Sequence, residues 1–148
     1  MTPRNRVQIL HGVNLDMLGR RDPDHYGTLT YAELEVRIAD FGYELGLVLS
    51  FFGTNHEGEL IERLHGIIDV ADGIVINPGA WTHYSWALRD ALELTGLPAV
   101  EVHLSNVHER EQWRRHSVIS DLCVATIAGK GVEGYREALE LLRREFER

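Results

Sequence analysis

The stretch GIVINPGAWTHYSWALRDALELTGLPAVEVH, residues 73–103, contains the pattern that decides the fold. It opens with a short apolar run, Gly73–Ile76, which stops at the turn residues 77–79 and is typical of a buried strand. A helix is predicted from about Thr82 to Thr95, and these side chains are expected to face inward: Trp86, Leu88 and Leu92. A second apolar run, Pro98–Val102, ends at His103. Strand, helix and strand in this order predict a βαβ unit with two parallel strands.

Strands and helices alternate in the same way along the rest of the chain. Apolar runs predict further strands at Val7–Leu10, Leu47–Phe52 and Leu122–Ala128, and helical spacing predicts helices near residues 30–45, 60–68 and 131–148. Five strands with right-handed crossovers predict an α/β, flavodoxin-like, doubly wound fold, in which a parallel sheet of strand order 2-1-3-4-5 lies between two helical layers. Because the length suits one domain and no repeat or low-complexity tract divides it, residues 1–148 are expected to form a single domain.

Local signals refine the ends of these elements. Thr30 and Glu33 have the spacing of a capping box at a helix start. Thr54 and Glu57, three positions apart, suggest a second cap of the same kind. The segment from residue 104 to residue 120 is polar and irregular, and one short helix is expected near its middle.

Composition limits the partners and the compartment. The net charge of −8 and the absence of a long basic run do not favour nucleic-acid binding. No apolar stretch is long enough to cross a membrane, and the N-terminal residues MTPRNRVQIL lack a signal-peptide core. The only cysteine, Cys123, excludes an intramolecular disulfide and is expected to be a small buried residue within the last strand. These features predict a cytoplasmic protein.

A long loop follows the first predicted strand. The segment His11–Gly27, reading HGVNLDMLGRRDPDHYG, has neither helical nor strand periodicity, and loops of this length are usually lids or binding loops. In parallel sheets, ligands bind at the carboxyl ends of the strands, near the point where the strand order reverses. The candidate site residues are therefore the polar ones that follow the first, third and fourth strands: Asn14, Arg21, Tyr26, Asn77, His83, His103, Ser105, Asn106 and Arg114. The loop after the second strand, with Asn55 and His56, is expected to lie farther away.

The candidate residues indicate proton transfer. A tyrosine acts as a general base when nearby cations stabilise its phenolate, and Arg20 and Arg21 are close enough to Tyr26 in sequence to do so. Glu101 and His103 lie two apart on one strand, so their side chains share a face. A carboxylate bound to one ring nitrogen fixes the tautomer of a histidine and favours the protonated ring of a general acid. With a side-chain amide to orient a water or an oxyanion, these groups suit proton abstraction beside a carbonyl, followed by elimination.

Four separated motifs carry a resemblance to a known family. They read NLDMLGRRDPDHYG at 14–27, NHEGEL at 55–60, NPGAWTH with ALRDAL within 77–92, and EVHLSNVHEREQWRRHS at 101–117. The chain resembles the type II 3-dehydroquinate dehydratases over nearly its whole length. The resemblance implies dehydration of 3-dehydroquinate to 3-dehydroshikimate, in the shikimate pathway of chorismate and aromatic amino-acid biosynthesis or in quinate breakdown. It also implies a lyase that uses no cofactor and no metal, assembled as a homododecamer built from trimers.

The resemblance implies a role for each site residue. Tyr26 would remove a proton from C2, with Arg21 sustaining its phenolate. His103, oriented by Glu101, would protonate the leaving C1 hydroxyl, and Asn14 would hold a water that stabilises the enolate. The substrate-binding residues implied are Asn77, His83, the Leu104 backbone, Ser105, Arg114 and, from a neighbouring subunit, Asp90. The first loop would close as a lid.

Some residues depart from the common family pattern, and alternatives stay open. The departures are His11, Val13, Phe52, Tyr84 and Trp86, which are expected to affect substrate affinity or assembly more than chemistry. One alternative is a metal-dependent hydrolase or lyase that uses His83, His103 and a carboxylate, although no HxH or HExxH spacing occurs. Another is a catalytically retired homologue that serves as a binding assembly. A lysine imine mechanism would need Lys130, the only lysine, which lies outside the candidate cluster.

Overall fold

The computed structural model describes residues 2–148 and contains an open, five-stranded parallel sheet of strand order β2-β1-β3-β4-β5. The strands are β1 (Arg6–His11), β2 (Val48–Gly53), β3 (Gly73–Asn77), β4 (Ala99–His103) and β5 (Ala125–Ala128). Strand β1 pairs with both β2 and β3, so the strand order reverses beside it. The predicted flavodoxin-like, doubly wound fold is confirmed.

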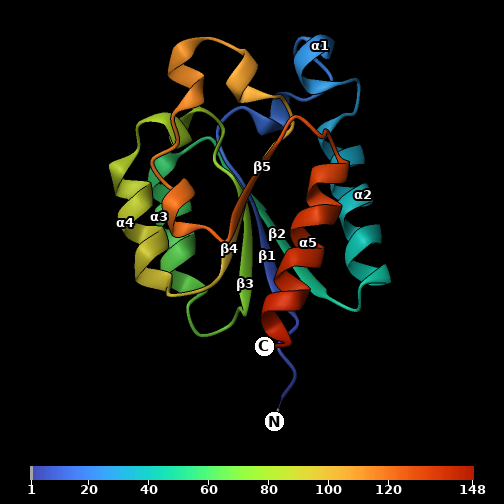
Figure 1. Cartoon of the computed structure of the whole chain (residues 1–148), viewed down its shortest axis with the longest axis vertical. Helices are drawn as coiled ribbons and strands as arrows, with labels where there is room; N and C mark the ends of the chain where they lie inside the picture. Colours follow the sequence, from blue (N-terminus) through green and yellow to red (C-terminus); the bar gives the residue numbers. More distant parts are fainter. Residues whose placement is uncertain (1) are drawn as a thin grey trace.

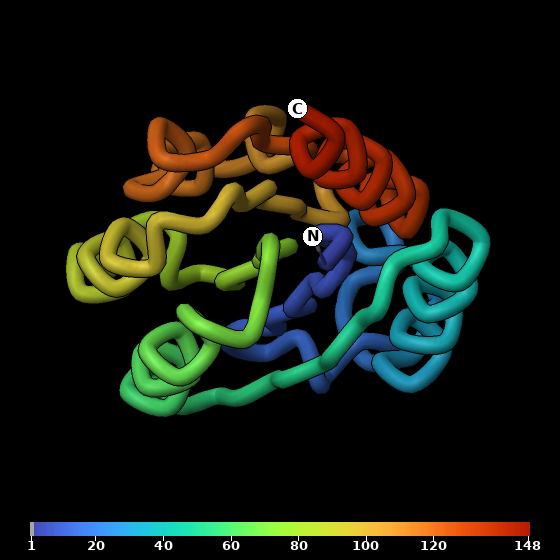
Figure 2. Tube along the Cα trace, turned by 90° about the horizontal axis from the view of Figure 1, so that it is seen from below, coloured from blue at the N-terminus to red at the C-terminus, as the bar shows by residue number. Residues whose placement is uncertain are grey.

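Helices cover both faces of the sheet, as Figures 1 and 2 show. On one face lie α2 (Tyr31–Glu44) and α5 (Glu133–Phe146), and on the other lie α3 (Glu57–Gly66) and α4 (Trp86–Thr95). The short helix α1 (Pro23–Tyr26) stands at the carboxyl end of the strands, and both chain termini lie at the opposite end (Figure 1). None of the helices in residues 2–148 is long and apolar enough to cross a membrane.

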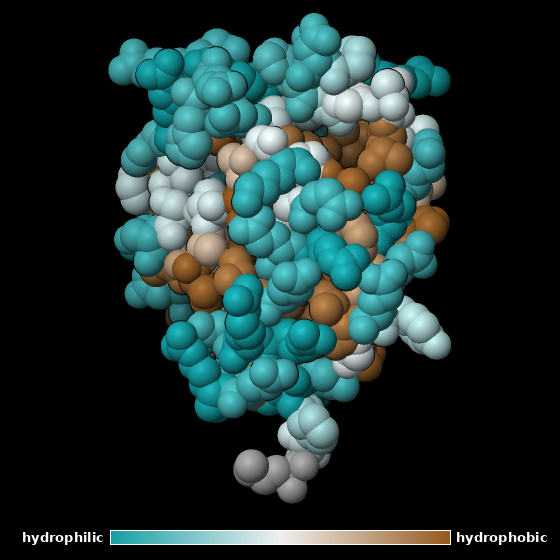
Figure 3. All heavy atoms as spheres, turned by 45° about the vertical axis from the view of Figure 1, so that its right-hand side comes forward, coloured by the Kyte–Doolittle hydropathy of each residue, from teal (hydrophilic) through white to brown (hydrophobic). Residues whose placement is uncertain are grey.

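Two hydrophobic clusters fill the space between the sheet and its helices. Neighbouring residues of β1 serve different clusters: Ile9 belongs to the one under α2 and α5, and Leu10 to the one under α3 and α4. This follows from the two-residue period of a strand, and it explains why strands buried on both faces read as continuous apolar runs. Seen from the side of α2, the outer surface is mostly hydrophilic with smaller hydrophobic patches, and the upper end is almost entirely hydrophilic (Figure 3).

One of the two predicted capping boxes is present. Thr30 Oγ1 accepts the Glu33 N–H at 3.1 Å, and Glu33 Oε1 accepts the Thr30 N–H at 3.3 Å. The other prediction is wrong, because α3 begins at Glu57 directly after His56, with no side-chain cap. Thr54 lies too early to reach the first helical N–H groups, and its hydroxyl instead accepts the His56 N–H at 3.0 Å.

Two further predictions about side-chain placement are wrong. Trp86 is 63% exposed although Leu88 and Leu92 of the same helix are buried. Two residues are separated by about 200° around an α-helix, so a helix that turns Leu88 to the core turns Trp86 to the outside. Cys123 precedes β5 instead of lying within it, and burial raises the pKa of its half-buried thiol to about 12.

The sheet is tightly packed where β1 and β3 end. The Gly12 N–H donates to the Asn77 carbonyl at 2.7 Å, and a Cβ at Gly12 would lie 2.2 Å from the Pro78 carbonyl oxygen. Only glycine permits this approach of two backbones. The loops that leave β1 and β3 therefore start side by side, at the point where the strand order reverses.

Candidate active site

A cavity of about 250 Å³ opens at the carboxyl edge of the sheet. Its walls come from the long loop after β1, the loop after β3 and the segment after β4. Most of the residues that sequence reasoning assigned to a site line it: Asn14, Arg21, Tyr26, Asn77, His83, His103, Leu104, Ser105 and Arg114. Its place beside the strand-order reversal is the one expected for ligands in this fold.

Tyr26 is held by two guanidinium groups. It ends α1, whose first turn is capped by the Asp22 carboxylate, which accepts the Asp24 N–H at 3.0 Å. Arg21 Nη2 donates to the Tyr26 phenol oxygen at 2.7 Å, and Arg110 Nη1 donates to the same oxygen at 2.5 Å. Two cationic donors thus meet on one phenol oxygen, and such charge-assisted hydrogen bonds are the strong ones in proteins.

Positive charge is concentrated around this phenol. The Arg21 guanidinium also lies over the Tyr26 ring, 3.7 Å from its centre. Burial lowers the pKa of Arg21, and the charges of Arg110 and Arg114 act in the same direction while Tyr26 opposes them. Arg20 was the other predicted cation, and that prediction is wrong, because Arg20 is exposed and lies outside the cavity lining.

Arg110 is a site residue that sequence reasoning missed. It lies 84 positions from Tyr26 in the chain, and its side chain is only 10% exposed. Its Nη1 atom is also within 3.4 Å of Ser105 Oγ, which places the guanidinium between the phenol and the end of β4. The available signal was its position inside the motif of residues 101–117, but no local spacing connects it to Tyr26.

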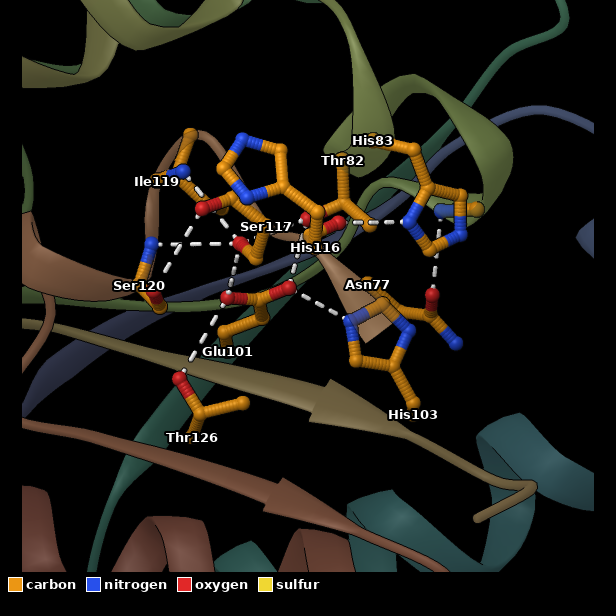
Figure 4. A network of polar contacts seen from close by, with 11 residues as sticks. Asn77, Thr82, His83, Glu101, His103, His116, Ser117, Ile119, Ser120 and Thr126 are labelled. Carbon is orange, nitrogen blue, oxygen red and sulfur yellow. Dashed lines mark hydrogen bonds and ion pairs between the residues drawn. The ribbon is translucent and has the colours of Figure 1, made fainter. Parts of the chain in front are cut away.

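Glu101 and His103 form the predicted pair at the end of β4 (Figure 4). His103 Nε2 lies 2.5 Å from Glu101 Oε2, and both residues are buried. Burial by itself would raise the pKa of Glu101, but hydrogen bonds from His103, Thr82 and Ser117 hold it below its usual range. Because an ionised carboxylate only accepts, Nε2 carries a proton, and Nδ1 is left on the side where Asn77 lies (Figure 4).

Asn14 is positioned by the loop after β2. Its backbone is left-handed, with φ of 68°, a conformation that asparagine tolerates better than most residues. The Asn14 N–H donates to Asn55 Oδ1 at 2.8 Å, and Asn55 Nδ2 donates to Asp16 at 3.1 Å. Asn55 lies outside the cavity lining, as expected, yet it braces the turn that presents Asn14 to the cavity.

The hydrogen bonds of His83 and Asn77 show which of their side-chain atoms can donate to a ligand and which can accept. His83 Nδ1 lies 2.7 Å from the His116 carbonyl, which can only accept, so Nδ1 carries the proton and Nε2 is an acceptor. Burial lowers the pKa of His83, which keeps the ring neutral near pH 7. Asn77 Oδ1 accepts the Gly79 N–H at 3.0 Å, so its amide nitrogen is the donor that remains for a ligand.

The segment after β4 closes one side of the cavity. It contains two short 3-10 helices, at 107–109 and 112–115, where one helix was predicted. Trp113, which the sequence did not single out, lines the cavity with its ring edge-on to His83 at a centroid distance of 5.2 Å. The Arg114 guanidinium lies 4.1 Å from the centre of the Trp113 ring, and its Nε donates to Glu111 at 2.7 Å. Arg114 is therefore presented to the cavity by a stacked, ion-paired arrangement.

Several predicted residues are not brought to this cavity. Asp90 is exposed on α4, beside Glu93 and Leu94. Tyr84 and Trp86 are also exposed and do not line the cavity. Within residues 2–148, no group of three or more histidine, cysteine, aspartate or glutamate side chains is arranged to hold a metal ion.

The fold and the cavity together define an α/β protein with an enzyme-like site at the carboxyl edge of its sheet, equipped with groups for proton transfer. Residues 5–143 match the family described as Dehydroquinase class II. The chain belongs to this family.

Individual relatives agree with that assignment. The chain is 49% identical over 135 residues to a 3-dehydroquinate dehydratase of Pelobacter propionicus, covering 90% of this chain and 91% of the relative. It is 47% identical over 142 residues to a 3-dehydroquinate dehydratase of Thermotoga maritima, covering 96% and 97% of the two chains. The crystal structure of type II dehydroquinase from Propionibacterium acnes superimposes with a TM-score of 0.91 at 41% identity, covering 97% of this chain and 99% of that one.

Proposed function

We propose that this chain dehydrates 3-dehydroquinate to 3-dehydroshikimate, a step of the shikimate pathway, through an enolate and without an imine or a metal. Membership of the family supports the reaction. The observation that carries the mechanism is that one cavity contains a tyrosine bound by two guanidinium groups and a histidine bound by a buried carboxylate. We take residues 1–148 to act as a single catalytic domain.

Tyr26 is the proposed base. Its phenolate takes a proton from C2 of the substrate, and the electrons of that C–H bond move to the neighbouring carbonyl to give an enolate. Arg21 and Arg110 favour the anionic oxygen before the proton arrives, with donor distances of 2.7 and 2.5 Å. A water held by Asn14 stabilises the enolate oxygen.

His103 is the proposed acid. When the enolate collapses, a double bond forms between C1 and C2, and the C1 hydroxyl leaves with a proton from the imidazolium. Nδ1 is the donating nitrogen, because Nε2 is already bound to Glu101 at 2.5 Å. The cycle ends when the proton on Tyr26 passes to solvent and His103 takes up another.

The other lining residues are proposed to hold the substrate. Asn77 through its amide nitrogen, the backbone of Leu104 and the hydroxyl of Ser105 bind the carboxylate and a nearby hydroxyl. Neutral His83 accepts from a ring hydroxyl through Nε2, and Arg114 donates to another. The loop that carries Arg21 and Tyr26 acts as a lid.

The assembly is part of the proposal. Asp90 lies away from the cavity of its own chain, and α4 exposes apolar side chains that a neighbouring copy could cover: Trp86 and Leu94. We propose that Asp90 reaches the cavity of a neighbouring subunit in a homododecamer built from trimers. We place the enzyme in the cytoplasm.

The test is a steady-state assay with 3-dehydroquinate, with and without a chelator, following the ultraviolet absorbance of the conjugated product. Turnover that a chelator does not change would support the reaction and its independence of metal. Tyr26→Phe and His103→Ala should each lower kcat by several orders of magnitude while substrate binding survives, because each removes a proton-transfer group. The base assignment is wrong if Tyr26→Phe keeps more than about a tenth of wild-type turnover. A folded, oligomeric protein without turnover would favour the retired homologue.

A further inference from the structure

A polar cluster surrounds the Glu101 carboxylate, with Ser117 and Thr126 on the side away from His103 (Figure 4). Thr82 is buried, Ser117 is half-buried and Thr126 is exposed. The Glu101 carboxylate is fully buried, and Oε2 accepts from Thr82 Oγ1 at 2.5 Å as well as from His103. Oε1 accepts from Ser117 Oγ at 2.8 Å and from Thr126 Oγ1 at 3.4 Å. These contacts occupy the four acceptor positions that an ionised carboxylate has.

The hydroxyl of Ser117 differs from the other donors, because its polarity is fixed. Its oxygen accepts the backbone N–H of Ile119 at 3.2 Å and that of Ser120 at 3.1 Å. A serine oxygen has two lone pairs, and both are used by these amides. The hydroxyl proton must therefore point away from them, where Glu101 Oε1 lies at 2.8 Å and Thr82 Oγ1 at 3.0 Å. The ionised carboxylate is the nearer and the stronger acceptor of the two. Ser117 can donate to residue 101 and cannot accept from it.

The backbone around Ser117 is held in place on both sides. The Val118 N–H donates to the Thr82 carbonyl at 2.7 Å. Arg89 Nη1 donates to the Val118 carbonyl at 2.7 Å, and Arg89 also binds Asp121. Val118 and Ile119 are buried in the core. The amides that fix the polarity of the hydroxyl are therefore not free to turn away.

Thr82 lacks this property. Its hydroxyl contacts Glu101 at 2.5 Å and Ser117 at 3.0 Å, and no backbone N–H of the described residues donates to it. Because both lone pairs of the Ser117 oxygen are occupied, the Thr82 proton goes to Glu101, but the hydroxyl is able to reverse if residue 101 becomes a donor. Ser117 is thus the group in the cluster that requires a hydrogen-bond acceptor at the Oε1 position of residue 101.

We propose that Ser117 is a positioning residue that, through Glu101, decides which ring nitrogen of His103 carries the proton. Ser117 demands an acceptor at the Oε1 position. The carboxylate satisfies that demand and still presents an acceptor, Oε2, to His103. The ring is then fixed with a proton on Nε2 and with Nδ1 toward the cavity. The catalytic consequence rests on the proposed role of His103 as the acid.

Glu101→Gln gives the proposal a sharp test. An amide has one acceptor and one donor end, and Ser117 requires the acceptor oxygen at the Oε1 position. The amide nitrogen is then forced to face His103, where it donates to Nε2 and moves the ring proton to Nδ1. We expect a kcat loss of at least about a hundredfold, by analogy with the cost of a wrong tautomer in triad enzymes. The neutral ring should show Nδ1 protonated and Nε2 unprotonated.

The double variant Glu101→Gln with Ser117→Ala removes the demand for an acceptor at Oε1. The amide can then turn its oxygen to His103 and Thr82 and its nitrogen toward Thr126, which restores the proton to Nε2. We expect kcat of the double variant to be at least about tenfold higher than kcat of the single variant. Glu101→Gln with Ser120→Ala is the matched control, because Ser120 adds only a 3.4 Å contact to the Ser117 carbonyl and does not touch Glu101. This control should behave as the single variant does.

The primary readout is solid-state 15N NMR of protein with 15N-labelled histidine, because protonated and unprotonated ring nitrogens give separate signals. The method also works for assemblies that are too large for solution NMR. The His103 signals are identified by their loss in His103→Ala. Nε2 protonation in the single variant would overturn the proposal even if the double variant did not fold. The same tautomer and the same kcat in the single and double variants would also overturn it. If wild-type protein shows no turnover, the proposed function fails, and the NMR signals still decide the role of Ser117.

Discussion

Replacing Arg110 by methionine tests the part of the site that only the structure revealed. The substitution keeps the length of the side chain and removes its charge and its hydrogen bond to the Tyr26 oxygen, which is 2.5 Å long. Arg21 remains as the other donor, at 2.7 Å. The side chain of Arg110 is only 10% exposed, so solvent screens its charge poorly.

The expected loss follows from the cost of one charge-assisted hydrogen bond. Such a bond to an ionised oxygen contributes about 1.5–3 kcal/mol. Because the base must carry negative charge on this oxygen to take the substrate proton, loss of the bond should lower kcat/KM by about ten- to a hundredfold.

The assay is kcat/KM for 3-dehydroquinate over a series of pH values, by the absorbance of the product. Arg115→Met is the matched control, because Arg115 lies in the same segment but is exposed and outside the cavity lining. Its kcat/KM should stay within about twofold of wild type, as expected for an exposed side chain away from the site. The reasoning is refuted if Arg110→Met keeps more than about half of the wild-type value, or if both variants lose the same factor at every pH.

Three other predictions follow from the same contacts. Borohydride with substrate should not inactivate the enzyme, because Lys130 is exposed and bound to Glu137 at 2.6 Å; inactivation with a modified Lys130 would contradict the enolate mechanism. Burial alone would raise the pKa of Asp72, but hydrogen bonds from Arg6 hold it below its usual range, so Asp72→Asn should lower the free energy of unfolding by about 1–2 kcal/mol at pH 7. In denaturant titrations, that difference should shrink as the pH falls below about 4, because the wild-type carboxylate is then lost; a difference independent of pH would refute the assignment. Asp90→Ala should lower activity without unfolding the chain, and co-refolding with Tyr26→Phe should restore part of it; no restoration would exclude a shared site.

The sequence determined the fold and the local pairs of the site. Alternating apolar runs and helical spacings are local properties of the chain, and together with the right-handed crossover rule they predicted the strand order that the structure shows. Glu101 and His103 were predicted as a pair because two residues on one strand share a face wherever that strand lies. The capping box at Thr30 was predicted for the same reason, since its partner is three residues away.

Two predictions about individual residues failed. Trp86 was expected inside together with Leu88, but the two are about 200° apart around α4, so the burial of Leu88 turns Trp86 outward. Thr54 was expected to cap α3, but two residues, Asn55 and His56, separate it from Glu57, where the helix begins.

Only the tertiary structure decided which distant groups meet. Arg110 reaches Tyr26 from 84 positions away, and Ser117 reaches Glu101 from 16 positions away. The segment between residues 104 and 120 has no regular periodicity, so its path is set by packing on the sheet, by the bond from Val118 to Thr82 and by the anchor at Arg89. Pattern reasoning sees the residue types in such a segment but not the direction of their side chains. For that reason the sequence supplied the residues proposed as acid and base, and the structure supplied the second cation beside Tyr26 and the serine proposed to orient His103.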